Sequence, residues 1–227
     1  MKRRIPCFCE NAFTIEVPDE IDLDKDPSCL NRIMEGSFMS FNCPNCGKKH
    51  KPEFPLTVLW VSKKLRLEVF TELDRGEFYR RKKGPLDLQT ENGIIKTESI
   101  ISYPEMADRL AVIRDGFEPA AVEAIKYYLY LKAEESYPDD EVSIWYSGCS
   151  TENPAEKGNA GASHPAFLEF HIHGIKEDEV AVTKIPWSLY EKTLLDYRTH
   201  PKNEIFLALR VRTYLSVKNT MRPEVFR

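Results

Sequence analysis

Four cysteines in the N-terminal part of the chain have the types and spacing of metal ligands. Cys43 and Cys46 are separated by two residues and followed by Gly47. This is the spacing of a zinc knuckle, in which two sulfurs reach one ion across a tight turn. Glycine allows the backbone to turn back, so that its amides face the thiolates. Cys7 and Cys9 lie earlier in the chain, and the two pairs together would supply four sulfur ligands to a structural Zn²⁺ ion.

A thioredoxin-like redox role is the main alternative for Cys43 and Cys46. A redox pair of this spacing opens a helix, whose N-terminus lowers the pKa of the thiol. The residues that follow Gly47 lead instead into a strand-like segment. The pattern therefore favours metal binding over redox chemistry.

The segments around the cysteines predict short strands, one helix and a hairpin. Phe13 to Val17 alternates apolar and polar residues, as a strand does. Asp26-Pro27 fits an N-cap and a first helical residue, and Gly36 fits the end of that helix. A strand over Ser37 to Asn42 would lead to the second cysteine pair. Two apolar runs around Lys63-Lys64 predict the hairpin, namely Thr57 to Ser62 and Leu65 to Thr71.

Several motifs of this region fall in a consistent order: Asp26-Pro27, Leu30, Met34-Glu35-Gly36-Ser37, Phe41-Asn42-Cys43-Pro44-Asn45-Cys46-Gly47, Pro55-Leu56 and Leu65-Arg66-Leu67. Together they resemble the CpXC family, bacterial proteins named for paired Cys-Pro-x-Cys motifs. The resemblance covers roughly residues 5 to 130 and is best from Asp26 to Val69. It implies a metal-binding module and no particular biochemical activity.

The first cysteine pair departs from the pattern of that family. It reads Pro6-Cys7-Phe8-Cys9, with the cysteine and the proline exchanged, so its turn is one residue shorter. Cys9 matches the second cysteine of the motif. We predict that a locally tightened backbone lets Cys7 ligate as well, because tetrahedral zinc requires four donors. In the alternative, His50 or Cys29 takes the place of Cys7.

The rest of the chain predicts a charged linker, two helices and a small αβ unit. Residues Gly76 to Ile94 are charged and rich in turn residues. Helices are expected from Pro104 and Pro119, and a third from Pro186. Strands are expected over 142–146, 167–173, 180–185 and the alternating run Ile205 to Val217. We therefore predict an α+β fold in four parts: a zinc-ribbon-like module (1–75), a linker or loop (76–99), a helical connector (100–137) and a C-terminal αβ unit with antiparallel strands (138–227).

Two histidines in the C-terminal half suggest a second metal chemistry. His171 and His173 are two residues apart on an expected strand, so they share a face. With Glu169 they could hold a catalytic metal, and His164 precedes them. No further ligand motif accompanies them, so a polar sheet face with Phe170 and Ile172 packed inward is favoured over a metal-dependent enzyme.

Basic residues concentrate between residues 47 and 83. Eleven Lys or Arg residues and five acidic ones give this segment a net charge of +6. Four aromatic residues lie among them: Trp60, Phe70, Phe78 and Tyr79. Such a face could follow phosphates and stack on bases, but a solvated surface is the commoner explanation of a charge run. Nucleic-acid binding is an alternative function on this basis.

Composition indicates an ordinary globular protein. The 227 residues are 42% hydrophobic and 30% charged, with a formal net charge of −4, so neither a nucleic-acid nor a membrane partner is expected for the whole chain. No apolar run approaches a membrane span and no signal peptide is visible. We expect a cytoplasmic location, where cysteines bind metals or stay reduced. The leading interpretation is a non-catalytic, zinc-stabilised binding or regulatory protein whose partner, a protein or a nucleic acid, the sequence does not identify.

Overall fold

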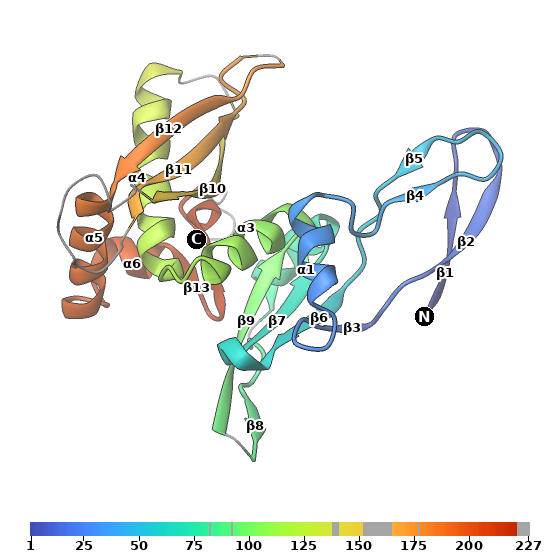
Figure 1. Ribbon diagram of the computed structural model, residues 1–227, viewed down its shortest axis with the longest axis horizontal. Coiled ribbons are helices and arrows are strands. Elements are labelled where there is room, and N and C mark those ends of the chain that lie inside the picture. Colours follow the sequence, from blue (N-terminus) through green and yellow to red (C-terminus); the bar gives the residue numbers. More distant parts are fainter. Residues whose placement is uncertain (82, 92, 138–140, 152–164, 177, 222–227) are drawn as a thin grey trace. The chain divides into compact units, whose positions relative to one another are not determined.

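A computed structural model describes residues 1–81, 83–91, 93–137, 141–151, 165–176 and 178–221. The chain divides into two compact units (Figure 1). Unit 1 contains residues 1–107 and 212–214, and unit 2 contains residues 108–211 and 215–227. The mixed α+β fold agrees with the sequence prediction. The division into two units differs from the four parts expected at residues 75, 99 and 137.

Unit 1 begins with two antiparallel hairpins that carry the paired cysteines (Figure 1). The first joins β1 (Lys2–Pro6) to β2 (Ala12–Glu16), and the second joins β4 (Phe41–Asn42) to β5 (Lys49–His50). A small apolar cluster lies beneath them, with four buried residues: Ile5, Ile15, Val17 and Met39. The strand predicted over 37–42 is thus limited to its last two residues.

The helix predicted after Asp26 is confirmed as α1 (Pro27–Met34). The Asp26 side chain accepts a hydrogen bond from the Cys29 backbone N–H, which gives the helix its N-cap. Gly36 follows the helix with a φ of 66°, the left-handed conformation that ends helices. Cys29 is buried on the inner face of α1.

A mixed sheet forms the centre of unit 1. Its order is β14-β9-β7-β6-β3, and β8 pairs with the outer part of β9. The predicted hairpin is confirmed: β6 (Leu56–Trp60) and β7 (Leu65–Phe70) pair antiparallel, and alternate residues of each strand are buried. The remaining strands are β3 (Glu20–Asp22), β8 (Leu88–Thr90), β9 (Gly93–Ile101) and β14 (Tyr214–Leu215).

The prediction of a linker over 76–99 is wrong for much of that segment. Helix α2 (Arg75–Arg80) covers the first residues of that segment. The residues of β9 from Lys96 onwards pair parallel with β7. Two buried positions of β9 are polar, Thr97 and Ser99. These polar residues interrupt the alternating apolar pattern by which a strand is recognised, so the sequence did not reveal β9.

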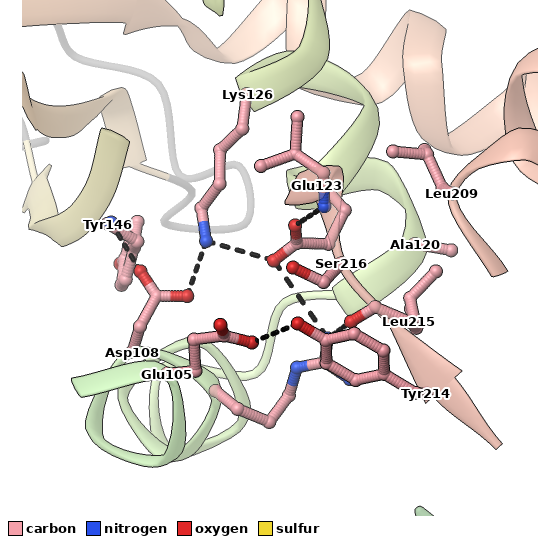
Figure 2. A network of polar contacts seen from close by, with 12 residues as sticks. Glu105, Asp108, Ala120, Glu123, Lys126, Tyr146, Leu209, Tyr214, Leu215 and Ser216 are labelled. Carbon is pink, nitrogen blue, oxygen red and sulfur yellow. Dashed lines mark hydrogen bonds and ion pairs between the residues drawn. The ribbon is translucent and has the colours of Figure 1, made fainter. Parts of the chain in front are cut away.

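Residues 212–214 return to complete the core of unit 1. Tyr214 is fully buried beside Phe78 and Ile101. Its hydroxyl donates to Glu105 over 2.5 Å and accepts from Arg75 over 3.0 Å. Figure 2 shows the hydrogen bond between Glu105 and Tyr214. Arg75 also pairs with Glu105 at 2.5 Å, so the tyrosine is held by a closed set of polar contacts.

Unit 2 combines an antiparallel sheet with two long helices. The sheet order is β10-β11-β12, with bounds Ser143–Thr151, Pro165–His173 and Ala181–Pro186. Helix α3 (Tyr103–Arg114) enters the unit, α4 (Pro119–Ser136) packs against β10 and α5 (Trp187–Thr199) against β11. These helices and strands confirm the predicted ones. The loop residues 152–163 of the sequence prediction, and His164, lie outside the described residues.

The strand predicted over 205–217 is wrong. The segment instead forms α6 (Glu204–Ala208), β13 (Arg210–Val211), a reversal at Arg212, β14 and a 3-10 turn (Val217–Asn219). Phe206, Leu209, Leu215 and Val217 are buried together with Ala120 and Ala124 of α4. The alternation therefore reflects several short elements that each contribute an apolar side chain.

A charged network is buried within unit 2 (Figure 2). Lys126, only 2% exposed, contacts the carboxylates of Asp108 and Glu123, the latter at 2.9 Å. Asp108 also accepts from the Tyr146 backbone N–H, and Glu123 from that of Val217. The opposite charges and the hydrogen bonds to the remaining oxygens offset the cost of burying these ionic groups. Through its members the network joins α3, α4, β10 and the chain after β14.

Candidate metal centre

The four predicted cysteines converge at the tips of the two N-terminal hairpins. Their sulfurs all lie within 4.8 Å of one another. Two short contacts join the hairpins: Cys7 Sγ lies 3.6 Å from Cys46 Sγ, and Cys9 Sγ lies 3.7 Å from Cys43 Sγ. The cluster therefore connects the hairpins crosswise. Among the described residues, these four cysteines are the one group of three or more His, Cys, Asp or Glu side chains that is placed to hold a metal ion.

The shortened first turn still directs Cys7 into the cluster. The Cys7 N–H donates to Asn11 O over 2.8 Å, and the Glu10 N–H donates to Cys7 O over 3.0 Å. Glu10 adopts a φ of 65°, which reverses the chain in fewer residues. The chain thus turns one residue sooner than it does after Cys43, and the Cys7 sulfur still reaches the cluster.

The second turn closes in the same way with one residue more. The Cys43 N–H donates to Lys48 O, and the Gly47 N–H donates to Cys43 O, both over 2.9 Å. Gly47 has a φ of 71°, a conformation that glycine adopts without strain. Both hairpins thus present two sulfurs to the same point.

Three side chains with N–H groups surround the sulfurs. Asn11 Nδ2 donates to Cys43 Sγ over 3.8 Å, and Asn45 Nδ2 donates to Cys9 Sγ over 3.5 Å. His50 Nε2 lies 3.2 Å from Cys7 Sγ. His50 therefore does not replace Cys7 but lies behind it, where it can orient the sulfur. The motif spacing did not reveal the two asparagines.

The polypeptide shifts the pKa values of the thiols in opposite directions. Backbone N–H groups of Cys46 and Asn45, partly opposed by desolvation, lower the pKa of Cys43 to about 6. The Asn45 side chain and the Asn11 backbone lower the pKa of Cys9. The Cys9 backbone N–H favours the Cys7 thiolate, but desolvation and the neighbouring thiols outweigh it and raise the pKa of Cys7 to about 12. At neutral pH these pKa values favour the thiolate of Cys43 and the neutral thiol of Cys7.

The donor set suits a soft, tetrahedral metal ion. Four thiolates around one ion are the ligand set of structural zinc sites, and the sulfurs of such a site lie just under 4 Å apart. The 3.6 and 3.7 Å cross-hairpin distances are close to that geometry. N–H groups that face the sulfurs are the usual outer contacts of a thiolate site.

The histidine pair of unit 2 does not form a comparable site. His171 Nε2 lies 3.7 Å from Glu169 Oε1, both side chains being partly exposed. Phe170 and Ile172 point into the core, while His171 and His173 lie on the opposite face of β11. This is the polar sheet face that the sequence analysis favoured. Among the described residues no metal-binding group includes either histidine.

The basic segment 47–83 lacks two of its expected stacking platforms. Trp60 and Phe78 are buried, 8% and 2% exposed, so neither presents a ring face to solvent. Arg75 is engaged with Glu72 and Glu105 inside unit 1. The role predicted for these two aromatic residues in base stacking is therefore wrong.

Comparison with known proteins agrees with the cysteine pattern. Residues 5–126 match the family model described as CpXC protein. An uncharacterised protein of Treponema pallidum (strain Nichols) is 28% identical over 225 residues, which cover 95% of this chain and 97% of that protein. No solved structure matches the chain. None of the helices in the described ranges is long and apolar enough to cross a membrane.

Proposed function

The chain belongs to the CpXC family, and we propose that Cys7, Cys9, Cys43 and Cys46 together bind one zinc ion. The observation that carries the proposal is the convergence of four sulfurs from two separate hairpins within 4.8 Å. Thiols stay reduced in the cytoplasm, where they are available to bind a metal. We therefore include a cytoplasmic location in the proposal.

The small size of the local elements supports a structural role for the proposed zinc ion. The strands β4 and β5 have two residues each, and the apolar cluster beneath the hairpins contains only four buried residues. Elements of this size are marginal alone. A metal that binds only the folded arrangement adds its binding free energy to folding, so zinc would hold the hairpins together.

The same ligand set supports a non-catalytic role. Four thiolates fill the tetrahedral shell of zinc and leave no position for water or substrate. We therefore assign the protein a binding or regulatory function, in which the metal maintains the surface of the hairpins. Phe8, at the tip of the first hairpin, is 85% exposed, which makes this tip the best candidate for contact with a partner.

Metal analysis of the purified protein tests the proposal. Elemental mass spectrometry should find one zinc per chain, and Cys43→Ser should remove it while Cys149→Ser, in unit 2, should not. Protein that holds no metal when purified under reducing conditions, and that does not take up zinc, would contradict the proposal. A second metal equivalent that survives Cys43→Ser would instead direct attention to His171 and His173.

Single-stranded nucleic acid is the second candidate partner, and one observation favours it. The Lys48 ammonium group lies 4.1 Å from the centre of the exposed Phe8 ring, and Lys49 and Lys51 are also exposed. An exposed ring can stack on a base while exposed lysines in the same segment as its neighbouring cation contact phosphates. Replacing the three lysines by alanine should flatten the dependence of log affinity on log salt by nearly one unit per lost contact. If the wild type shows no salt-dependent binding, the partner is not a nucleic acid.

A further inference from the structure

The four sulfurs of the cluster differ in their access to solvent. Cys7 and Cys43 are buried, 8% and 2% exposed, and Cys9 is half-buried. Cys46 is exposed. A reagent dissolved in water therefore meets Cys46 first.

The sulfurs differ also in the N–H groups around them. Three of them face a side-chain nitrogen: Cys43 faces Asn11, Cys9 faces Asn45 and Cys7 faces His50. In the described part of the chain, the hydrogen-bonding neighbours of Cys46 Sγ are other sulfurs, namely those of Cys7 and Cys9. Hydrogen bonds that stabilise a thiolate lower its nucleophilicity along with its basicity. Cys46 thus keeps the most nucleophilic sulfur as well as the most accessible one.

A second thiol, that of Cys7, lies close to Cys46. Cys7 Sγ is 3.6 Å away, on the other hairpin. A disulfide requires the two sulfurs to approach to about 2.05 Å, which is a small movement for an exposed hairpin tip. Cys9 and Cys43 form the other close pair at 3.7 Å, but both of them are more shielded than Cys46.

We propose that Cys46 is the residue at which peroxides modify this protein, and that the product is a disulfide between Cys46 and Cys7. The inference rests on the proposed zinc site, because it concerns thiolates bound to that ion. It assigns the cluster a second property, the reversible release of its metal under oxidation.

The reaction balances with hydrogen peroxide as the oxidant. The Cys46 thiolate attacks one peroxide oxygen, so that an S–O bond forms, the O–O bond breaks and hydroxide leaves and takes up a proton. The Cys7 thiolate then attacks the sulfur of the resulting sulfenic acid, which forms the S–S bond and expels a second hydroxide. Two thiolates, one peroxide and two protons give one disulfide and two waters. The zinc ion is left with Cys9 and Cys43 and is released.

Alkylation of the zinc-loaded full-length protein tests the reactivity of Cys46. Cys149 is exposed too, so Cys149→Ser serves as the parent protein. With substoichiometric N-ethylmaleimide, peptide mapping should show Cys46 modified on the order of tenfold faster than Cys7, Cys9 or Cys43. Equal rates at the four cysteines, or faster labelling of another one, would overturn the inference.

Oxidation of the same protein tests the product. One equivalent of hydrogen peroxide should release zinc, detected with a chromogenic chelator, and peptide mapping should find Cys7 joined to Cys46. A reductant and added zinc should restore the starting state. A disulfide between Cys9 and Cys43, or zinc that stays bound, would overturn the inference while the zinc site stands. A protein that takes up no zinc would overturn both proposals.

Removal of one hydrogen bond tests the cause of the difference. In Asn45→Ala, Cys9 loses the N–H donor at 3.5 Å, so its alkylation rate should rise roughly fivefold. Asn42→Ala is the matched control, since Asn42 is an exposed residue of β4 next to Cys43 and is not among the side chains hydrogen-bonded to sulfur in the described chain. If the two variants behave alike, the N–H groups do not determine which sulfur reacts.

Discussion

Glu10 and Gly47 hold equivalent positions at the tips of the two cysteine hairpins. Each follows the second cysteine of its pair, has a φ near 70° (65° and 71°), and donates its N–H to the carbonyl of the first cysteine. A glutamate in this conformation carries a cost of roughly 1 kcal/mol that glycine avoids. The first hairpin is therefore the more strained of the two.

Substitutions at these two positions should change the zinc affinity in opposite directions. Glu10→Gly relieves strain and should raise the affinity about fivefold, whereas Gly47→Ala should lower it by at least that factor, since about 1.4 kcal/mol corresponds to tenfold. Apart from its two chain neighbours, no described residue lies within 4 Å of the position that a Cβ would take at Gly47. The lower affinity of Gly47→Ala would therefore have a conformational and not a steric cause. Competition with a chelator measures both affinities. Asp178→Gly, at a φ of 59° in unit 2, is the control and should leave zinc affinity unchanged.

Loss of one ligand should unfold the hairpins selectively. Cys43→Ser removes a buried thiolate, and zinc affinity should fall roughly hundredfold or more, with the associated folding free energy. Limited proteolysis should then cleave within residues 1–50 first, while unit 2 resists as in the wild type. Identical digestion patterns of the variant and the wild type would show that the cluster does not stabilise the fold.

Zinc binding should release fewer than four protons at about pH 7.5. Cys43, with a pKa of about 6, is already a thiolate there, whereas Cys7, with a pKa of about 12, must lose its proton to the ion. Below the pKa of Cys43 that thiol is protonated too, so the number of protons released should rise as the pH falls through about 6. Calorimetry in buffers of different ionisation enthalpy counts these protons. A number that stays the same across this range would contradict the assigned pKa of Cys43.

The buried lysine of unit 2 should be far more important for stability than its exposed neighbour. Lys126→Met leaves Asp108 and Glu123 without the cation that both contact, and loss of one partner of a buried ionic group costs about 3–5 kcal/mol. Lys132→Met, at an exposed position of the same helix, should change the free energy of unfolding by less than about 0.5 kcal/mol. Urea denaturation followed by the fluorescence of Trp145 and Trp187 compares the two. Equal midpoints would show that the network is not stabilising.

Local patterns predicted most helices and strands of the fold because short-range rules determine them. Asp26-Pro27 and Gly36 bounded α1 correctly, and the alternation of Leu65, Leu67 and Val69 identified β7. The same rule failed for 205–217, where apolar residues two apart are shared among α6, β13, β14 and a turn. It missed β9 because two of its core positions, Thr97 and Ser99, carry polar side chains. The Ser99 hydroxyl is hydrogen-bonded there to that of Thr213.

The cysteines of the candidate metal centre were predictable from their spacing, but the arrangement of the cluster was not. Two cysteine pairs imply a common ion, yet only the folded hairpins show that Cys7 pairs with Cys46 and Cys9 with Cys43. The place of His50, beside Cys7 rather than instead of it, depends on the register of β5 with β4. Contacts of this kind come from tertiary structure, which motif spacing does not contain.

The return of residues 212–214 to unit 1 affects the order of events during synthesis on the ribosome. Unit 1 is otherwise complete at residue 107, but Tyr214, which fills its core, is translated last among its parts. At roughly 5–20 residues per second, this strand follows the rest of the unit by about 5–20 s. During this interval the β9 edge of the nascent unit is not yet paired with β14. The contacts of Tyr214 with Glu105 and Arg75 have also not yet formed. A fragment that ends at residue 126, the limit of the family match, would remain in that unfinished state permanently.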